Sequence, residues 1–264
     1  MVHGNPTWSF YYRRLILELR QSYRAIVPDH IGCGFSDKPN DTDYAYTLSR
    51  RVDDFEALMS SLDLNENVTL VLHDWGGMIG MAWAIRHPEA VARIVLLNTA
   101  AFHLPKTKGF PWRLWFARTP VGAFSVRGFN AFSRLATRMA VTRAKMPKEI
   151  REAYCAPYDS WNNRIATLRF VQDIPLTPDD PAYDLVSEVQ GKLSTFCDTP
   201  ALICWGLRDF VFDETFLEQW RRYLPNAEVH RFADSGHYIL EDAAEEVTGL
   251  VKNFLQANPL RRSS

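Results

Sequence analysis

Short apolar runs alternate with amphipathic stretches along most of the chain, and this pattern predicts strands that alternate with helices. Residues 68–72 (Val-Thr-Leu-Val-Leu) are β-branched or leucine, which predicts a strand buried on both faces. Further strands are predicted at residues 23–28, 91–98, 201–205 and 228–232. Helical periodicity predicts helices at residues 10–19, 47–62, 212–223 and 243–255. The alternation favours an α/β fold with a mostly parallel sheet flanked by helices.

The alternation stops between residues 100 and 185. This segment contains aromatic-rich helical patches separated by prolines, which predicts a helical cap inserted into the α/β core. The core then comprises residues 1–99 and 186–258. Residues 259–264 are expected to form a disordered tail.

A sharp polar turn follows the strand at residues 68–72. Asp74 comes two residues after it, Gly76 and Gly77 follow, and a small-and-apolar run then predicts a helix. A buried strand that turns into a helix in this way is the nucleophile elbow of an α/β-hydrolase, although the commoner motif has serine at the turn. A carboxylate there attacks carbon directly and forms a covalent ester. The alternative is that Asp74 only caps the helix.

Two further side chains follow predicted strands, in the order expected of a catalytic triad. Strand 201–205 runs into Asp209, and strand 228–232 runs into His237. The carboxyl ends of parallel strands meet at one edge of an open sheet, so both side chains are expected near Asp74. His237 would take a proton from water, and Asp209 would orient its ring and stabilise the imidazolium. Rival acids with a poorer spacing are Asp213, Asp234 and Asp242.

Asn5 and Trp75 are candidates for binding a leaving group. Displacement of a leaving group from carbon creates negative charge, which preorganised donors stabilise. Trp75 offers an indole N–H beside Asp74, and Asn5 offers an amide on the facing loop. The backbone N–H groups of Asn5 and Trp75 are the natural oxyanion hole for resolving the ester. Core packing of Trp75 and a turn role for Asn5 before Pro6 are the alternatives.

Composition excludes several classes of function. The net charge of the 264 residues is −1, and no basic cluster is larger than the Arg261-Arg262 pair in the tail, so nothing indicates nucleic-acid binding. No apolar run reaches about 18 residues, so no transmembrane segment is predicted. The first residues contain no basic segment followed by an apolar leader, so no signal peptide is predicted and a cytoplasmic location is expected.

The cysteines and the glycine-rich loop provide no cofactor site. The four cysteines lack the C-x-x-C and histidine spacings typical of zinc, and we expect them to be reduced thiols: Cys33, Cys155, Cys197 and Cys204. Residues 29–37 have a G-x-G element but lack the third glycine and the helix of a dinucleotide site. We therefore expect neither a metal nor a cofactor.

Several motifs together resemble the haloalkane dehalogenase family of α/β-hydrolases, over nearly the whole chain. They are residues 3–8 (HGNPTW), residues 29–37, residues 73–77 (HDWGG), and Gly236-His237 with Glu241-Asp242. The resemblance implies Asp74 as nucleophile, His237 as base, and Asn5 with Trp75 as leaving-group donors. One branch of the family has a glutamate as triad acid after the strand that follows the elbow. Asn98 occupies that position here, so the branch that uses Asp209 fits better.

Within that branch, cap residues 154–164 and 170–175 resemble the β-lactone decarboxylases of bacterial long-chain olefin biosynthesis. The resemblance implies that Asp74 attacks a cis-dialkyl β-lactone, which breaks down to a cis-olefin and carbon dioxide. An aromatic cap suits the shelter of two long alkyl chains. A small hydrophobic substrate is thus the expected ligand, and other olefin-pathway enzymes are possible partners.

Three other functions stay open. A haloalkane dehalogenase would hydrolyse a carbon–halogen bond to alcohol and halide through the same covalent ester. An epoxide hydrolase also uses an elbow aspartate, with paired cap tyrosines for which Tyr154, Tyr158 and Tyr183 are available, but an aromatic residue is expected where Asn5 stands. A catalytically dead binding module would keep the fold without turnover.

The resemblance also bears on the start of the chain. Relatives normally carry some tens of residues before the His-Gly-Asn-Pro motif, and these supply the first strands of the sheet. We expect the chain to begin inside the third strand, with the N-terminal strands missing. An unpaired strand edge of this kind predicts a risk of aggregation.

Overall fold

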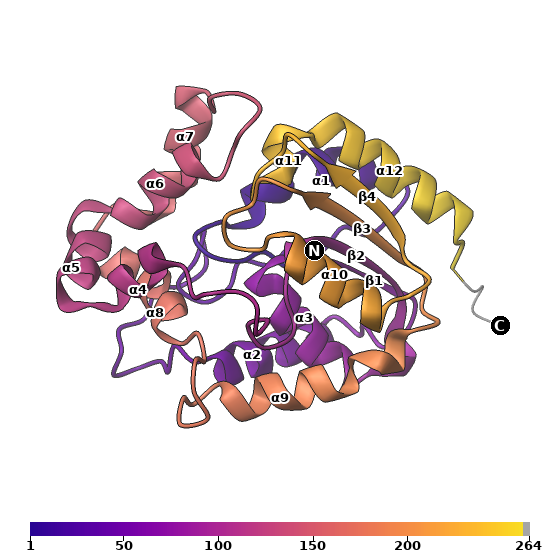
Figure 1. Cartoon of the computed structure of the whole chain (residues 1–264), viewed down its shortest axis with the longest axis horizontal. Coiled ribbons are helices and arrows are strands. Elements are labelled where there is room, and N and C mark those ends of the chain that lie inside the picture. The colour runs from indigo at the N-terminus through magenta and orange to yellow at the C-terminus, as the bar shows by residue number, and fades with distance from the viewer. Residues whose placement is uncertain (261–264) are drawn as a thin grey trace.

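A parallel sheet forms the centre of the computed structural model, which describes residues 1–260 (Figure 1). In this part of the chain the strands lie in the order β1-β2-β3-β4. Their bounds are Val68–Asp74 (β1), Val91–Thr99 (β2), Ala201–Gly206 (β3) and Glu228–Phe232 (β4). Leu97 pairs with His73 on one side and with Cys204 on the other, so the strands end at the same edge of the sheet. The predicted α/β fold is confirmed.

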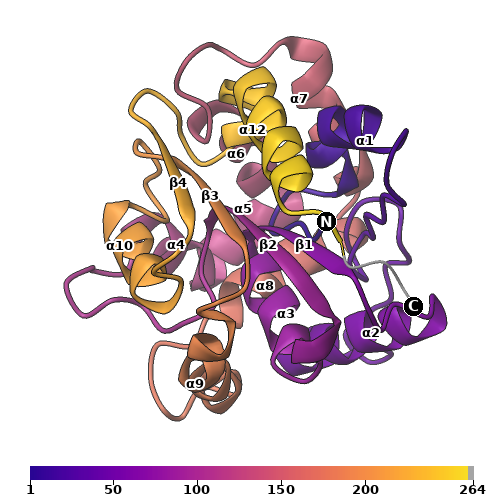
Figure 2. The same ribbon diagram turned by 90° about the vertical axis from the view of Figure 1, so that its right-hand side faces the viewer.

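Helices cover both faces of the sheet (Figure 2). Side chains alternate along a strand, so Leu70 and Leu72 enter one core with α2, α3, α9 and α10, whereas Val71 enters the other with α1, α11 and α12. These helices are α1 (Arg13–Leu19), α2 (Leu48–Ser61), α3 (Trp75–Ala84), α9 (Tyr183–Lys192), α10 (Glu214–Tyr223), α11 (Ile239–Asp242) and α12 (Ala244–Ala257).

The predicted helices are confirmed to within two residues at most boundaries, and the side chain of Thr47 accepts the Arg50 N–H as the N-cap of α2. Residues 10–19 form a 3₁₀ turn, Ser9–Tyr12, followed by α1. Of the expected disordered tail, residues 261–264 lie outside the described part of the chain, and residues 259–260 have no regular secondary structure.

The strand predicted at residues 23–28 is wrong. The Ile26 carbonyl accepts a hydrogen bond from the Met1 amino group (2.7 Å), and within residues 1–260 no backbone ladder joins this segment to a strand. A run of β-forming residues becomes a strand only when a neighbour supplies such a ladder. The free side of β1 is instead met by Val2, which forms a single parallel bridge with Leu72.

Five α-helices lie between β2 and α9 and form a separate layer beside the sheet (Figure 1). They are α4 (Trp112–Arg118), α5 (Pro120–Phe129), α6 (Ala131–Met139), α7 (Lys148–Cys155) and α8 (Ile165–Gln172). Ala117, Val126, Leu168 and Val171 form a small core of their own. We propose that residues 100–185 are the cap and the flanking segments the core, with α9 packed on the core side against α3.

None of the helices in the described residues is both long and apolar enough to cross a lipid bilayer.

Candidate active site

The turn between β1 and α3 has the geometry of a nucleophile elbow. Asp74 has φ 50° and ψ −127°, which is uncommon for a residue with a side chain and marks a strained turn. A Cβ on Gly76 would lie 1.9 Å from the Val2 carbonyl oxygen, and a Cβ on Gly77 would lie 1.9 Å from Thr99 Oγ1. Both glycines are therefore needed for the helix to start so close to its neighbours.

The Asp74 side chain does not cap α3: among the described residues it makes no capping hydrogen bond to that helix. Its Oδ1 instead accepts the backbone N–H of Asn5 (2.6 Å). Gly4 permits this contact, because a Cβ there would lie 1.9 Å from the same oxygen. The capping alternative is therefore wrong, and the carboxylate is turned toward the cavity and His237.

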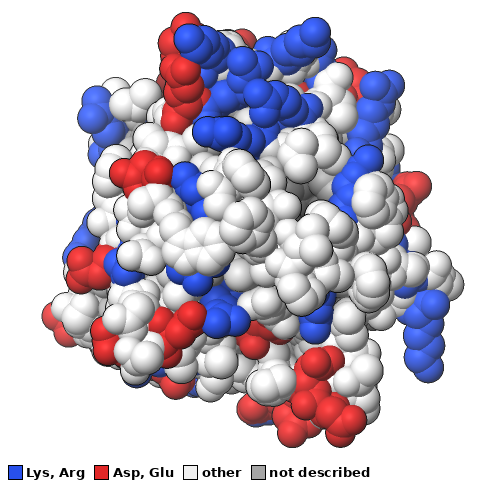
Figure 3. All heavy atoms as spheres, turned by 90° about the vertical axis from the view of Figure 1, so that its left-hand side faces the viewer, with Lys and Arg blue, Asp and Glu red and all other residues white. Residues whose placement is uncertain are grey.

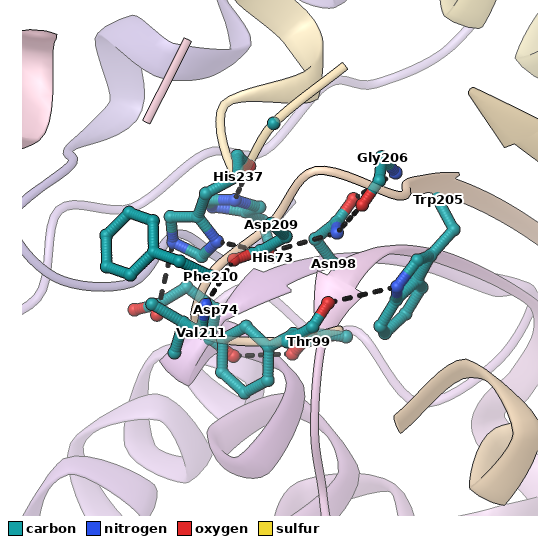
Figure 4. A network of polar contacts seen from close by, with 12 residues as sticks. His73, Asp74, Asn98, Thr99, Trp205, Gly206, Asp209, Phe210, Val211 and His237 are labelled. Atoms are coloured by element: carbon teal, nitrogen blue, oxygen red, sulfur yellow. Dashed lines mark hydrogen bonds and ion pairs between the residues drawn. The ribbon is translucent and has the colours of Figure 1, made fainter. Parts of the chain in front are cut away.

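His237 lies between two carboxylates (Figure 4). Its Nδ1 donates to Asp209 Oδ2 at 2.7 Å, and its Nε2 is 3.5 Å from Asp74 Oδ2. All three side chains are at least nine-tenths buried. The structure thus brings together the three residues predicted from the strand ends.

The rival acids do not approach His237 in the described structure. Asp213 caps α10 and pairs with Lys108, Asp234 pairs with Arg143, and Asp242 accepts backbone N–H groups of Thr142 and Gly236.

Asn98 holds Asp209, the acid that orients His237, in place. Its Nδ2 donates to Asp209 Oδ2 and to the Gly206 carbonyl, both at 3.0 Å, and its Oδ1 accepts the Gly206 N–H at 2.8 Å. From the sequence, Asn98 was only the position where a glutamate is absent, and this role was not predicted. Its position as a polar residue at the end of a buried strand was the available signal.

Thr99 and His73 support the site from behind, and both were missed. Thr99 Oγ1 donates to the Asp74 carbonyl at 2.5 Å, which fixes the backbone of the elbow. His73 Nε2 lies 2.9 Å from the His237 carbonyl. Because a carbonyl only accepts, Nε2 carries the hydrogen. Burial first, and then the charge of His237, lower the pKa of His73 to about 3, so it is neutral.

The charges of the site are coupled. Burial alone would lower the pKa of His237, but the carboxylates of Asp209 and Asp74 outweigh it and raise that pKa to about 10. Burial acts to raise the pKa of Asp74, and the hydrogen bond and charge of His237 reverse this and lower it. At neutral pH the site therefore holds an ionised Asp74 next to an imidazolium.

Asn5 and Trp75 both line the cavity beside Asp74. Asn5 Nδ2 donates one hydrogen to the Thr167 carbonyl at 3.0 Å, and its Oδ1 has no partner in the described residues. One amide N–H of Asn5 thus remains for a ligand. Trp75 packs against Phe170 with ring centroids 5.3 Å apart, which fixes its indole next to the elbow.

A cavity of about 510 Å³ extends from these residues into the cap. Its lining is mostly apolar, with aromatic and leucine side chains from the cap: Phe110, Trp112, Leu114, Phe116, Phe132 and Leu135. An apolar wall with a few convergent polar groups suits an apolar ligand that is oriented at one end. Within residues 1–260 no cluster of three or more His, Cys, Asp or Glu side chains is placed to hold a metal ion.

We expect Asn98→Ala to lower the free energy of unfolding by about 3 kcal/mol, because it leaves the buried Gly206 N–H without its acceptor and removes the Asn98 hydrogen bond to Asp209. The φ of 40° at this position adds strain for alanine. Urea unfolding followed by circular dichroism measures the change. Asn226→Ala, at an exposed position, is the matched control, and an equal loss in both variants would contradict the role given to Asn98.

Comparison with known proteins agrees with this geometry. The family model for the alpha/beta hydrolase fold matches residues 1–244. The cis-3-alkyl-4-alkyloxetan-2-one decarboxylase of Shewanella oneidensis is 60% identical over 97% of this chain and 80% of its own length. Haloalkane dehalogenase 1 of Mycobacterium bovis is 31% identical over 97% of this chain and 83% of its own length.

A solved structure shows the same fold. The haloalkane dehalogenase of Agrobacterium tumefaciens superimposes with a TM-score of 0.86 at 26% identity, covering 98% of this chain and 88% of that chain. The sheet, the elbow and these relatives lead to one conclusion. The chain is an enzyme of the α/β-hydrolase fold family, related to the haloalkane dehalogenases and, at higher identity, to the cis-3-alkyl-4-alkyloxetan-2-one decarboxylases.

Proposed function

We propose that the protein is a β-lactone decarboxylase that converts a cis-dialkyl β-lactone to a cis-olefin and carbon dioxide. The observation that carries this proposal is the 60% identity, over 97% of the chain, to a protein named for a 3,4-dialkyl oxetanone. The apolar cavity above Asp74 supports it, because it offers room for alkyl chains and one polar end for the ring.

In the first step the Asp74 carboxylate attacks ring carbon 4 of the lactone. A bond forms between this carbon and an Asp74 oxygen, and the bond to the ring oxygen breaks. The ring oxygen leaves as a carboxylate on carbon 3, so the negative charge moves from Asp74 to the substrate. Asn5 and Trp75 are the donors we assign to that leaving carboxylate, since both line the cavity beside the elbow.

In the second step the new carboxylate is lost as carbon dioxide. The electron pair of the breaking carbon–carbon bond forms the double bond between carbons 3 and 4, and the ester bond to Asp74 breaks. Attack inverts carbon 4, so loss of carbon dioxide anti to the ester gives the cis-olefin from the cis-lactone. The sequence consumes no water and no proton, and Asp74 is regenerated.

This chemistry suits a His237 that stays protonated. Because its pKa is raised to about 10, the imidazolium balances the Asp74 carboxylate before attack and the substrate carboxylate afterwards. The role of water-activating base is needed only when an ester must be hydrolysed. We therefore assign His237 to electrostatic stabilisation in decarboxylation, oriented by Asp209.

Haloalkane dehalogenation is the second candidate, and the 31% identity to a haloalkane dehalogenase favours it over other reactions. Asp74 would displace halide, and His237 would then activate water. When Asp74 is esterified its charge is lost, which removes one of the effects that raise the pKa of His237 and makes it a better base.

An epoxide hydrolase and a dead binding module are less well supported. Tyr154 donates to Glu241 at 2.5 Å and Tyr158 lies 3.4 Å from the Thr7 carbonyl, and neither is among the residues that line the cavity. The buried ionised set of Asp74, His237 and Asp209 is costly to keep in a protein without turnover.

A cytoplasmic location and cooperation with other olefin-pathway enzymes also belong to this proposal. All four cysteines are free, as expected of a reducing compartment. A strained β-lactone must come from a ring-forming enzyme upstream, which makes such an enzyme a natural neighbour.

Product analysis by gas chromatography and mass spectrometry tests the proposal. We expect a cis-olefin from a cis-dialkyl β-lactone and no enzyme-dependent alcohol from a 1-haloalkane. Running the lactone reaction in ¹⁸O-labelled water adds a second criterion, since the proposed steps place no solvent oxygen in Asp74. Halide and alcohol from the haloalkane, with the lactone untouched, would transfer the protein to the dehalogenases.

A further inference from the structure

The outer face of the cap is unusually apolar. Six large side chains on α4, α5 and α6 are each more than half exposed: Trp112, Trp115, Val121, Phe124, Phe129 and Leu135. We call them the cap face. Phe124 contacts both Phe129 and Trp161 with ring centroids 5.8 Å apart. Figure 3 shows a broad uncharged area in the middle of this side of the molecule, with basic and acidic side chains around it. Exposed apolar patches of this kind mark binding surfaces.

The segment that carries the cap face has basic residues and no acidic ones. Residues 112–147 contain seven arginines and lysines and no aspartate or glutamate, although the net charge of the whole chain is −1. Figure 3 shows a cluster of basic side chains along one edge of the uncharged area. Arg134 and Arg138 on α6 form no salt bridge among the described residues. These cations are available to an anionic surface.

The cap face continues into the active-site cavity. Trp112 and Leu135 are exposed on the surface and also line the cavity that contains Asp74 and His237. An apolar molecule that moves from the surface to the nucleophile therefore stays in contact with apolar side chains along this route.

We propose that the cap face docks on an anionic lipid bilayer and that the substrate enters the cavity from the lipid. This rests on the proposed function, because a lactone with two alkyl chains partitions into lipid and not into water. Tryptophan and phenylalanine insert at the headgroup level, and flanking arginines are attracted to anionic lipids. A second copy of the chain is a poorer occupant, since it would bring the same cations face to face.

Sedimentation of the full chain with vesicles tests the docking. We expect binding to vesicles of phosphatidylcholine with about a third phosphatidylglycerol, weak binding to phosphatidylcholine alone, and loss of binding at high salt because the attraction is screened. Arg134→Glu with Arg138→Glu should weaken binding about tenfold or more. Phe124→Ser with Phe129→Ser should weaken it as well. None of these four residues lines the cavity.

The controls separate this inference from the proposed function. Arg14→Glu with Arg20→Glu reverses two exposed charges, one on α1 and one at its C-cap, and should leave vesicle binding unchanged. A short-chain lactone dissolved in buffer should be turned over equally by wild type and the arginine variant, whereas a long-chain lactone carried in vesicles should be turned over more slowly by the variant.

Each outcome has one meaning. Turnover of the short lactone without vesicle binding would overturn the docking and leave the proposed function intact. Vesicle binding without turnover of either lactone would refute the proposed function and the route by which the lactone enters. Self-association through the cap face in light scattering, in place of vesicle binding, would also overturn the docking.

Discussion

Asp74→Asn abolishes turnover of the lactone and leaves the fold intact. The amide keeps an oxygen that accepts the Asn5 N–H, so the elbow contact of 2.6 Å is preserved while the nucleophilic charge is lost. Loss of a covalent nucleophile costs about 10⁴-fold or more in kcat. Olefin formation measured by gas chromatography should therefore fall to the level of the uncatalysed reaction, with an unchanged circular dichroism spectrum.

The matched control for Asp74 is Asp213, a carboxylate with a structural role only. Asp213→Asn alters the N-cap of α10 and the pair with Lys108, and should keep most of the activity. Turnover by Asp74→Asn above a few per cent of wild type, and similar to that of Asp213→Asn, would exclude attack by Asp74.

The three triad residues could be predicted from the sequence because they lie at the ends of strands. Asp74, Asp209 and His237 each follow a predicted strand, and parallel strands deliver their ends to one edge, so the pattern alone predicts that they lie together. Asn98 also lies at the end of its strand, but its hydrogen bond to Asp209 joins residues 111 positions apart through side-chain geometry and could not be predicted. Gly4 is similar: only the approach of Asp74 Oδ1 explains why it has no side chain.

Local sequence patterns did not predict the structure correctly where contacts with a distant segment determine it. The run at residues 23–28 has strand-forming residues but lacks a backbone ladder among the described residues. A capping role for Asp74 was the alternative left open by the sequence, because aspartate is a common N-cap. The φ of 50° and the contact with Asn5 decide against it.

His237→Gln separates the two candidate reactions. In decarboxylation no ester has to be hydrolysed, so the variant loses only the electrostatic support of the imidazolium. The expected loss in kcat is about 10²–10³-fold, typical of removing one preorganised charge or donor. In dehalogenation the variant cannot activate water, and the alkyl ester on Asp74 would accumulate. Mass spectrometry of the intact protein after incubation with a haloalkane detects that ester.

The pH dependence of the same variant tests the role of charge. In the wild type the stability contributed by the imidazolium is complete below pH 6.5 and is lost as the pH rises through about 10, because the pKa of His237 is raised from 6.5. We expect kcat/KM for the lactone to fall over that upper range, and His237→Gln to remove this fall.

His237→Gln also changes the acid limb of the kcat/KM profile. His237 lowers the pKa of Asp74 against the effect of burial, so without the imidazolium that pKa rises and activity is lost at a higher pH than in the wild type. A variant profile with both limbs unmoved would show that His237 and Asp74 do not act as an ion pair. The acid limb of the profile reports on Asp74 and the alkaline limb on His237, so each assignment is tested separately.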